Sequence, residues 1–524
     1  MTFESKLGSL WLNRPWAGPA VAALLAVALF AVTVTHGLVL DSKEMLVYGT
    51  FLTDPDTGPI DVWSHNLFHE IPGATPRGGY RPLTSTTLWL LPQVGLGAPA
   101  FHHALNSLMH GGVTFVLGLL LLEVGFSRAL AFAAALLFAT HPVHTEPVSY
   151  VVGRAEVMMA LFAVLGLLLY ARALRAETRG ASKRLMIGAL ACGFLAMTSK
   201  ENGAAVIGLV PIVEGWMALS GRPVRWHGMR RLAMWALWLL PLTVYLLLRH
   251  QVLGVLFTSG GEVVVSTIDD LPFRARALFA FAVLAQAWRV MLPIARLSAD
   301  YGANQIPVPD SLLSFPVLAG LLGAALLLAV PTLLPARSGD RSPAIALLGA
   351  AWFLIAWLPT SHLPFPVGEP FAERWLYLPS LGLTVWAIVC VRRLLGDGRA
   401  WWIAVGLLAS VMAASTAFHV QQWRSPHALT RATAQASPRS VRALYNAGTE
   451  ALLAGEYVEA LEWFDRYFSV APADDRRIPA ALNNQRFAQL AVQMHRDLGR
   501  YPAPPRSRHI SEFLGQHSGR PEAP

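Results

Sequence analysis

The sequence predicts an all-α polytopic membrane protein with about eleven transmembrane helices, followed by a short helical repeat module. Two observations predict this class. Of the 524 residues, 54% are hydrophobic and only 14% are charged, whereas ordinary soluble domains contain about 25% charged residues. The first apolar run, from Ala17 to Leu40, contains no Asp, Glu, Lys or Arg and is longer than the ~20 residues that a helix needs to cross the hydrocarbon layer.

The first run lacks the small-residue cleavage site of a signal peptide and is therefore interpreted as the first transmembrane helix. Ten further apolar runs follow it. Basic residues fall on alternate loops between the runs, and the positive-inside rule then predicts a cytoplasmic amino terminus and eleven crossings. This count requires that 274–295, which contains three arginines, does not cross but lies at or dips into the non-cytoplasmic face. The ten runs cover 103–122, 129–140, 157–171, 185–197, 203–219, 232–248, 313–335, 343–358, 376–391 and 400–418.

The net charge of +9 is explained mostly by this orientation of basic loops, and no nucleic-acid-binding module is visible. The two cysteines, Cys192 and Cys390, lie inside apolar runs, which excludes a disulfide framework.

The composition becomes that of a soluble protein from about Trp423. Gly448, Ala460, Phe464 and Pro472 match the small, small, aromatic and proline positions of a tetratricopeptide repeat. Its two helices are expected at about 440–454 and 457–471, with a fragment of a second repeat at 478–498, and an ordinary helical hairpin is the alternative. The predicted domains are a transmembrane domain at 1–422, a helical module at 423–500 and a disordered tail at 501–524. Eleven crossings place the helical module on the non-cytoplasmic side.

Three charged islands interrupt the apolar runs: Thr140–Glu156, Thr198–Asn202 and Glu373–Ser380. Ionisable groups at such positions are costly unless they are paired or functional. The predicted alternation of loops places the charged residues of all three islands, together with Asp41 and Arg81, on the non-cytoplasmic side. The sequence therefore predicts a membrane-embedded site on that face.

Sugar transfer from a polyprenyl-phosphate donor suits such a site, because the lipid tail needs the bilayer, the phosphate needs cations and the acceptor hydroxyl needs a base. Asp41, directly after the first run, is the candidate base, with Glu44 as the alternative carboxylate. Arginine pairs with phosphate through its fork of donors, and lysine supplies a point charge. The predicted phosphate-binding residues are Arg81, Arg154, Lys200 and Arg374, and the residues expected to line the site are His102, His141, His144, Glu146, Glu156, Glu201, Glu373 and Tyr377.

These residues also have structural interpretations. Asp41 could be a solvated residue at a helix end, and His141 and His144 could be interfacial residues that bond to backbone. No metal site is expected, because two prolines interrupt the spacing of the two histidines and Glu146. The charged residues could form structural ion pairs, namely Glu146 with Arg154, Glu373 with Arg374 and Lys200 with Glu201.

Motifs along the chain resemble those of the transmembrane and tetratricopeptide-repeat-containing protein family over residues 35–472. The motifs, in order, are Leu40-Asp41-Ser42, Tyr80-Arg81-Pro82-Leu83, Phe101-His102-His103-Ala104-Leu105-Asn106, the island from His141 to Glu146 with Gly153-Arg154-Ala155-Glu156, Lys200-Glu201-Asn202-Gly203 and Glu373-Arg374-Trp375-Leu376-Tyr377-Leu378-Pro379-Ser380. The resemblance implies a GT-C glycosyltransferase, inversion at the anomeric carbon and, as in eukaryotic members, protein O-mannosylation from dolichyl-phosphate mannose. No cofactor is expected. The family's acidic pair is interrupted here by Ser42, and the short repeat array indicates a bacterial member.

Two other functions stay open at this point. A transporter would use buried ion pairs, but its binding site usually lies near the bilayer midplane rather than at one face. A membrane-anchored interaction platform would use the repeat module and would leave the charged islands unexplained. For the glycosyltransferase, the expected partners are a polyprenyl-phosphate sugar, a protein or envelope-glycan acceptor and the lipid bilayer of a bacterial inner membrane.

Overall fold

The computed structural model describes residues 14–69, 79–223, 228–256, 268, 271–302, 305–335 and 339–497. The predicted disordered tail lies outside these residues. The regular elements of the described part are all helices, and the chain divides into two compact units. Unit 1 comprises Met1–Ala295, Val308–Gly368 and Glu373–Gln421, and unit 2 comprises Arg296–Pro307, Glu369–Ala372 and Gln422–Pro524.

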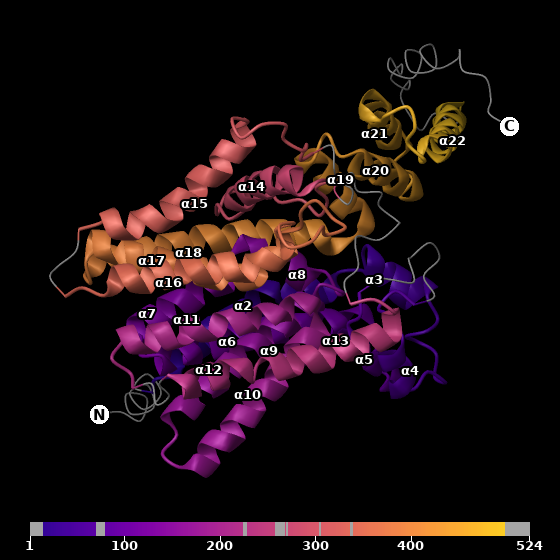
Figure 1. Ribbon diagram of the computed structural model, residues 1–524. Helices are drawn as coiled ribbons and strands as arrows, with labels where there is room; N and C mark the ends of the chain where they lie inside the picture. Colours follow the sequence, from indigo (N-terminus) through magenta and orange to yellow (C-terminus); the bar gives the residue numbers. More distant parts are fainter. Residues whose placement is uncertain are drawn as a thin grey trace, which may run out of the picture. The chain divides into compact units, whose positions relative to one another are not determined.

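Ten helical segments in the described part are long and apolar enough to cross a membrane, which confirms the predicted polytopic class (Figure 1). A shorter apolar helix, α7 (Arg128–Thr140), corresponds to the remaining predicted run at 129–140. The ten segments are α2 with η1 (Ala17–Thr35), α6 (Pro99–Glu123), α9 (Arg154–Arg175), α10 (Arg179–Ser199), η4 with α11 (Glu201–Leu219), α12 with α13 (Met229–Leu253), α15 (Phe315–Leu333), α16 with η5 (Ser342–Thr360), η6 with α17 (Glu373–Leu395) and α18 with η7 (Arg399–Arg424).

The first helical segment ends at Thr35, earlier than the expected Leu40. The residues before this end form the 3-10 helix η1 (Ala31–Thr35). The hydroxyl groups of Thr33 and Thr35 donate to carbonyls three residues earlier, at 2.7 and 2.8 Å. Such local bonds compete with a regular α-helix, and the chain is already extended at His36.

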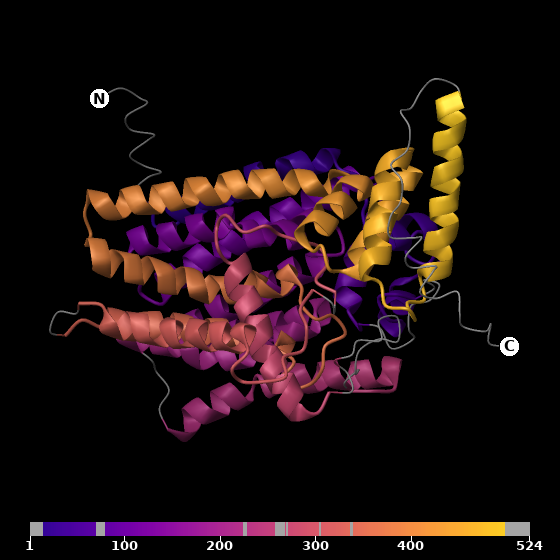
Figure 2. The same cartoon turned by 90° about the horizontal axis from the view of Figure 1, so that it is seen from above.

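The long helices of unit 1 differ in how deeply they are packed. Within the most apolar window of each helix, 72% of α9 is buried against 22% of α15. On α15, Leu322 and Leu333 are 60% and 80% exposed. Leucines with such a large exposed fraction are expected on a helix face that contacts lipid instead of water. Figure 2 shows that α17 and α18, the two orange helices, lie side by side and antiparallel.

The stretch predicted not to cross the membrane forms the 18-residue helix α14 (Phe273–Val290), which packs against α15. Three arginines near its ends, Arg274, Arg276 and Arg289, distinguish it from the ten spanning candidates. Its placement at one membrane face stays a prediction.

Shorter helices of unit 1 carry or adjoin the predicted site residues. Asp41 begins α3, Glu44 begins the π-helical turn that follows it, and Arg81 directly precedes α5. The bounds are α3 (Asp41–Lys43), η2 (Glu44–Tyr48), α4 (Pro59–Ser64), α5 (Pro82–Gln93), η3 (Pro142–His144) and α8 (Thr145–Ser149).

Unit 2 contains the helices expected for the repeat module. Gly448 on α20 and Phe464 on α21 show why a small residue is needed, since a Cβ at Gly448 would lie 2.8 Å from the Phe464 ring. Arg442 on α20 pairs with Asp300 and Glu369, which lie in the two other segments of the unit. The helices are α19 (Pro426–Ala436), α20 (Val441–Leu453), α21 (Tyr457–Val470) and α22 (Ile478–Asp497).

Candidate functional site

The candidate base, Asp41, is an exposed residue held by its neighbours. Leu40, immediately before it, has φ 50°, a conformation that costs about 1–3 kcal/mol in a residue other than glycine and is concentrated at functional sites. The Tyr150 hydroxyl donates a hydrogen bond of 2.7 Å to Asp41 Oδ2. Asp41 is therefore oriented by a side chain from the long charged island, 109 residues away in sequence.

Three ion pairs join predicted cations to predicted carboxylates. Arg81 donates from Nε and Nη2 to the two carboxylate oxygens of Glu201, at 3.0 and 2.7 Å. Lys200 Nζ pairs with Glu156. The side chain of Arg374 pairs with Glu146, whose second oxygen accepts the Arg374 backbone N–H at 2.9 Å. These contacts bring together segments of unit 1 that are far apart in the sequence.

These partners correct the structural pairs that sequence proximity suggested. Glu146 contacts Arg374 rather than Arg154, and Lys200 Nζ contacts Glu156 rather than its neighbour Glu201. The physical reason is that these charged residues lie in or beside short helices and helix ends, where an opposite charge on another packed segment lies closer than one nearby in the sequence.

Arg81 and Arg374 lie close enough to Lys200 for their charges to affect it. Burial lowers the pKa of Lys200, Glu156 opposes this effect, and the positive charges of Arg81 and Arg374 lower it further. The three cations differ in solvent exposure. The Arg374 side chain is 25% exposed and that of Arg81 is 17% exposed, whereas that of Lys200 is only 5% exposed. Of the three, Arg374 is the cation that an incoming anion reaches most easily.

Tyr150 connects Asp41 electrostatically to this charged cluster. Burial first, and then the Asp41 carboxylate, raise the pKa of the Tyr150 hydroxyl well above its ordinary value, while Arg374 lowers it and Glu146 raises it. The hydroxyl therefore stays protonated and acts as a hydrogen-bond donor to Asp41.

Arg154 has a different environment from the other predicted phosphate-binding residues. Its side chain is 0% exposed, and its guanidinium donates to neutral groups of Asn106, Thr87 and His102 at 3.0–3.4 Å. Its binding of phosphate stays a prediction. In the structure, this arginine ties the start of α9 to α5 and α6.

Two of the predicted site-lining histidines, together with Tyr377, belong to buried hydrogen-bonded groups. His144 Nε2 lies 2.9 Å from Ser380 Oγ, and the Tyr377 hydroxyl lies 2.7 Å from His110 Nδ1. His141 Nδ1 accepts the backbone N–H of residue 143 at 3.1 Å. Burial lowers the pKa of His141 to about 4, so its ring is neutral at neutral pH.

The remaining predicted residues lie in the same segments. Glu373 is buried in η6 next to Arg374, and Glu44 is exposed three residues after Asp41. Among the described residues, no group of three or more His, Cys, Asp or Glu is arranged to hold a metal ion.

Tyr150 and Asn106 are site residues that sequence reasoning missed. Tyr150 lies inside the long charged island, and Asn106 closes the motif at 101–106, so both were visible as motif members. Neither is charged at neutral pH, and a search for charged residues in apolar surroundings therefore does not select them.

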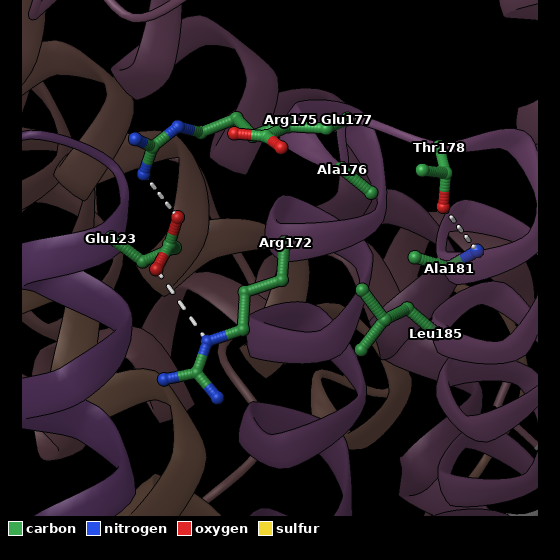
Figure 3. Close-up of a pocket in the computed structure, with 8 residues that line it drawn as sticks. All are labelled: Glu123, Arg172, Arg175, Ala176, Glu177, Thr178, Ala181 and Leu185. Atoms are coloured by element: carbon green, nitrogen blue, oxygen red, sulfur yellow. Dashed lines mark hydrogen bonds and ion pairs between the residues drawn. The ribbon is translucent and has the colours of Figure 1, made fainter.

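A pocket of about 530 Å³ lies elsewhere in unit 1 and contains none of the predicted site residues (Figure 3). Its walls include Glu123 at the end of α6, which pairs with Arg172 and Arg175 near the end of α9. Arg154 and Arg175 are the first and last residues of α9, about 32 Å apart at 1.5 Å per residue. This pocket therefore lies at the opposite end of α9 from Arg154.

Comparison with known proteins identifies the domain that carries part of this site. Residues 83–253 match the family model described as dolichyl-phosphate-mannose-protein mannosyltransferase. This range includes Arg154, Glu156 and Lys200, and excludes Asp41 and Arg374.

The chain is also homologous to curated proteins of the family that its motifs resemble, which confirms that resemblance. It is 27% identical to the human "Protein O-mannosyl-transferase TMTC4", with 86% of this chain and 66% of the relative covered. Identity to the mouse "Protein O-mannosyl-transferase TMTC3" is 26%, over 83% of this chain and 48% of the relative. The chain thus spans about half to two thirds of the length of these relatives. No solved structure matches it significantly.

Proposed function

We propose that this chain, which carries a domain of the dolichyl-phosphate-mannose-protein mannosyltransferase family, is a glycosyltransferase that moves mannose from a polyprenyl-phosphate donor to a hydroxyl group. The acceptor is a protein or an envelope glycan, and the site faces the non-cytoplasmic side of a bacterial inner membrane. The observation that carries the proposal is the hydrogen bond between Tyr150 and Asp41. The charges of Arg374 and Glu146 also shift the pKa of the Tyr150 hydroxyl, so both lie near the residue that contacts the candidate base. A candidate base and a candidate phosphate cation thus influence one side chain.

In this reaction the acceptor hydroxyl gives its proton to Asp41 while its oxygen attacks the anomeric carbon of the donor. The bond between that carbon and the phosphate oxygen breaks, and its electron pair stays on the phosphate. Attack from the side opposite the leaving phosphate gives the inversion that the GT-C resemblance implies. A positioned general base of this kind contributes about 10²- to 10⁴-fold to the rate.

The cations act on the leaving group. The phosphate carries one negative charge in the donor diester and gains a second as the bond breaks, so a cation that contacts it stabilises the transition state more than the donor. Arg374 and Arg81 suit this role, because their forked guanidinium groups are partly exposed. Lys200 adds a buried positive charge nearby. Each cation has a carboxylate partner that holds it in place.

The proposal is tested with the purified chain in lipid nanodiscs and synthetic polyprenyl-phosphate mannose labelled in the sugar. Envelope proteins and glycolipids from a strain without the gene serve as acceptors, and mass spectrometry identifies which fraction gains a hexose. We expect transfer to one of the two fractions. Polyprenyl-phosphate glucose is the matched donor that tests the choice of sugar. Lack of transfer from either donor by folded, membrane-inserted protein contradicts the proposal.

A further inference from the structure

The turn between α8 and α9 is held by one buried side chain of α6. The amide nitrogen of Asn106 lies 3.2, 3.0 and 3.4 Å from the carbonyl oxygens of Val148, Tyr150 and Val151. Asn106 is 0% exposed. These bonds involve only backbone carbonyls, so they hold the conformation of the turn. The Tyr150 side chain remains available for a different contact.

Arg154 in turn holds Asn106. Its Nε donates to Asn106 Oδ1 at 3.0 Å, while its other nitrogens donate to Thr87 and His102. A guanidinium that is 0% exposed and has neutral partners carries a large desolvation penalty. The hydrogen bonds offset part of this penalty, and they orient the amide of Asn106 toward the turn.

The other side of the turn is fixed by its contact with the segment of the candidate base. The Val152 backbone N–H donates to Ser42 Oγ at 3.3 Å. Gly153 allows the turn to close, since a Cβ there would lie 2.8 Å from the carbonyl oxygens of both Pro147 and Tyr150. A larger residue at this position would have to displace backbone.

The side chain that this turn directs toward Asp41 is that of Tyr150. Its hydroxyl donates to Asp41 Oδ2 at 2.7 Å. Asp41 is exposed, and this bond uses only one of its two carboxylate oxygens. Oδ1 can therefore accept the proton of an acceptor hydroxyl while Oδ2 is held.

We propose that Tyr150 is the positioning residue of Asp41, that it directs Oδ1 toward the acceptor, and that Asn106 and Arg154 hold the turn that carries it. This inference rests on the proposed transferase reaction for its catalytic consequence. Its structural part, the restraint of Asp41 by the turn, can be measured without any substrate.

The first test is Tyr150→Phe, which removes the hydroxyl and keeps the ring. We expect kcat to fall about 10- to 100-fold, since a hydrogen bond to a charged group is lost, with the donor KM unchanged. In an Asp41→Asn background, Tyr150→Phe should cause no further loss.

Tyr170→Phe is the matched control. The Tyr170 hydroxyl donates to the buried Glu214 carboxylate, which also receives bonds from Arg231 and Trp235 and lies outside the proposed site. The same substitution thus removes the same kind of bond elsewhere in unit 1. We expect this variant to lose thermal stability and to keep the wild-type kcat.

Hydrogen exchange separates this inference from the proposed function. In Tyr150→Phe, and in Asn106→Asp, which keeps an oxygen for Arg154 but loses the donors to the turn, amides of α3 and of the turn at 148–152 should exchange faster. Unchanged exchange in both folded variants overturns the inference, whether or not the protein transfers sugar. Faster exchange with normal kcat in an active protein overturns the catalytic role of Tyr150. A wild-type protein with the expected exchange and no transfer contradicts the proposed function alone.

Discussion

Lys200 and Glu156 form an ion pair across 44 residues of sequence, and their side chains are only 5% and 2% exposed. Lys200 lies between α10 and η4, and Glu156 lies in the first turn of α9. The negative charge is also favoured there by the positive end of the helix dipole. Removing one partner of such a buried pair leaves an uncompensated charge, which costs about 3–5 kcal/mol.

Replacing each partner and then both separates the structural role of this pair from its role in donor binding. Lys200→Met should lower the melting temperature in detergent strongly, and Glu156→Gln should do so as well. The double variant should lose less stability than the sum of the two single variants, because no unpaired charge remains. If Lys200 also supports phosphate binding, the folded double variant should have a raised donor KM. A normal donor KM would limit Lys200 to a structural role.

Arg374→Lys and Arg154→Lys should differ in their effect on the donor KM. Arg374 is partly exposed, so the loss of its fork should raise the donor KM about tenfold, within the range for a hydrogen bond to a charged group, and should also lower kcat, because the phosphate gains charge in the transition state. Arg154 is buried among neutral partners, so its replacement should lower thermal stability and kcat. Titration with labelled donor gives both constants. A raised donor KM in Arg154→Lys with unchanged stability would instead support the sequence-based prediction that Arg154 binds phosphate.

His141 should make the protein less stable in acid. Burial lowers the pKa of its ring to about 4 in the folded state, against about 6.5 in the unfolded chain. Its contribution is therefore fully present above pH ~6.5 and is lost as the pH falls toward about 4, with a slope of up to about 1.4 kcal/mol per pH unit. His141→Asn keeps an acceptor for the backbone N–H of residue 143 and should flatten this part of the stability curve. The exposed His250, replaced by Asn, is the control.

The membrane topology can be tested by cysteine labelling after both native cysteines, Cys192 and Cys390, are replaced by serine. A membrane-impermeant thiol reagent should label Asp56→Cys from outside, whereas Asp397→Cys should be labelled only after permeabilisation. Both of these positions are exposed. Leu292→Cys, just after the end of α14 and 57% exposed, tests whether α14 stays on the outer face. Labelling of this position only from the cytoplasmic side would show that α14 crosses.

The helices of this fold were more predictable from the sequence than the contacts between them. The apolar runs identified the long membrane helices, because length and hydrophobicity are local properties of the chain. The contacts of Glu146 and Lys200 were not predictable, since their partners depend on how helices pack. Alternate loops share a membrane face in any polytopic protein, so the sequence could indicate that the charged islands lie together. It could not indicate that the neutral side chain of Asn106 would hydrogen-bond to the turn within the longest island.

The strongest test of the proposed mechanism is Asp41→Asn, which keeps the size of the side chain and removes the basic carboxylate. If Asp41 accepts the proton, kcat should fall by about 10²- to 10⁴-fold, or ~3 to 5.5 kcal/mol of barrier. Donor binding should persist, because the phosphate is assigned to Arg81, Lys200 and Arg374. Product formation and donor binding are measured separately in nanodiscs.

Glu44→Gln is the comparison that makes this test decisive. Glu44 is exposed three residues after Asp41, but Tyr150 bonds to Asp41. The hydrogen bond therefore favours Asp41 as the base, and Glu44→Gln should keep most of the activity. If Glu44 is the base, the two variants will exchange phenotypes. Near-normal transfer by both variants, in protein shown to be inserted and folded, would remove the carboxylates of this segment from the mechanism and require a base from another segment.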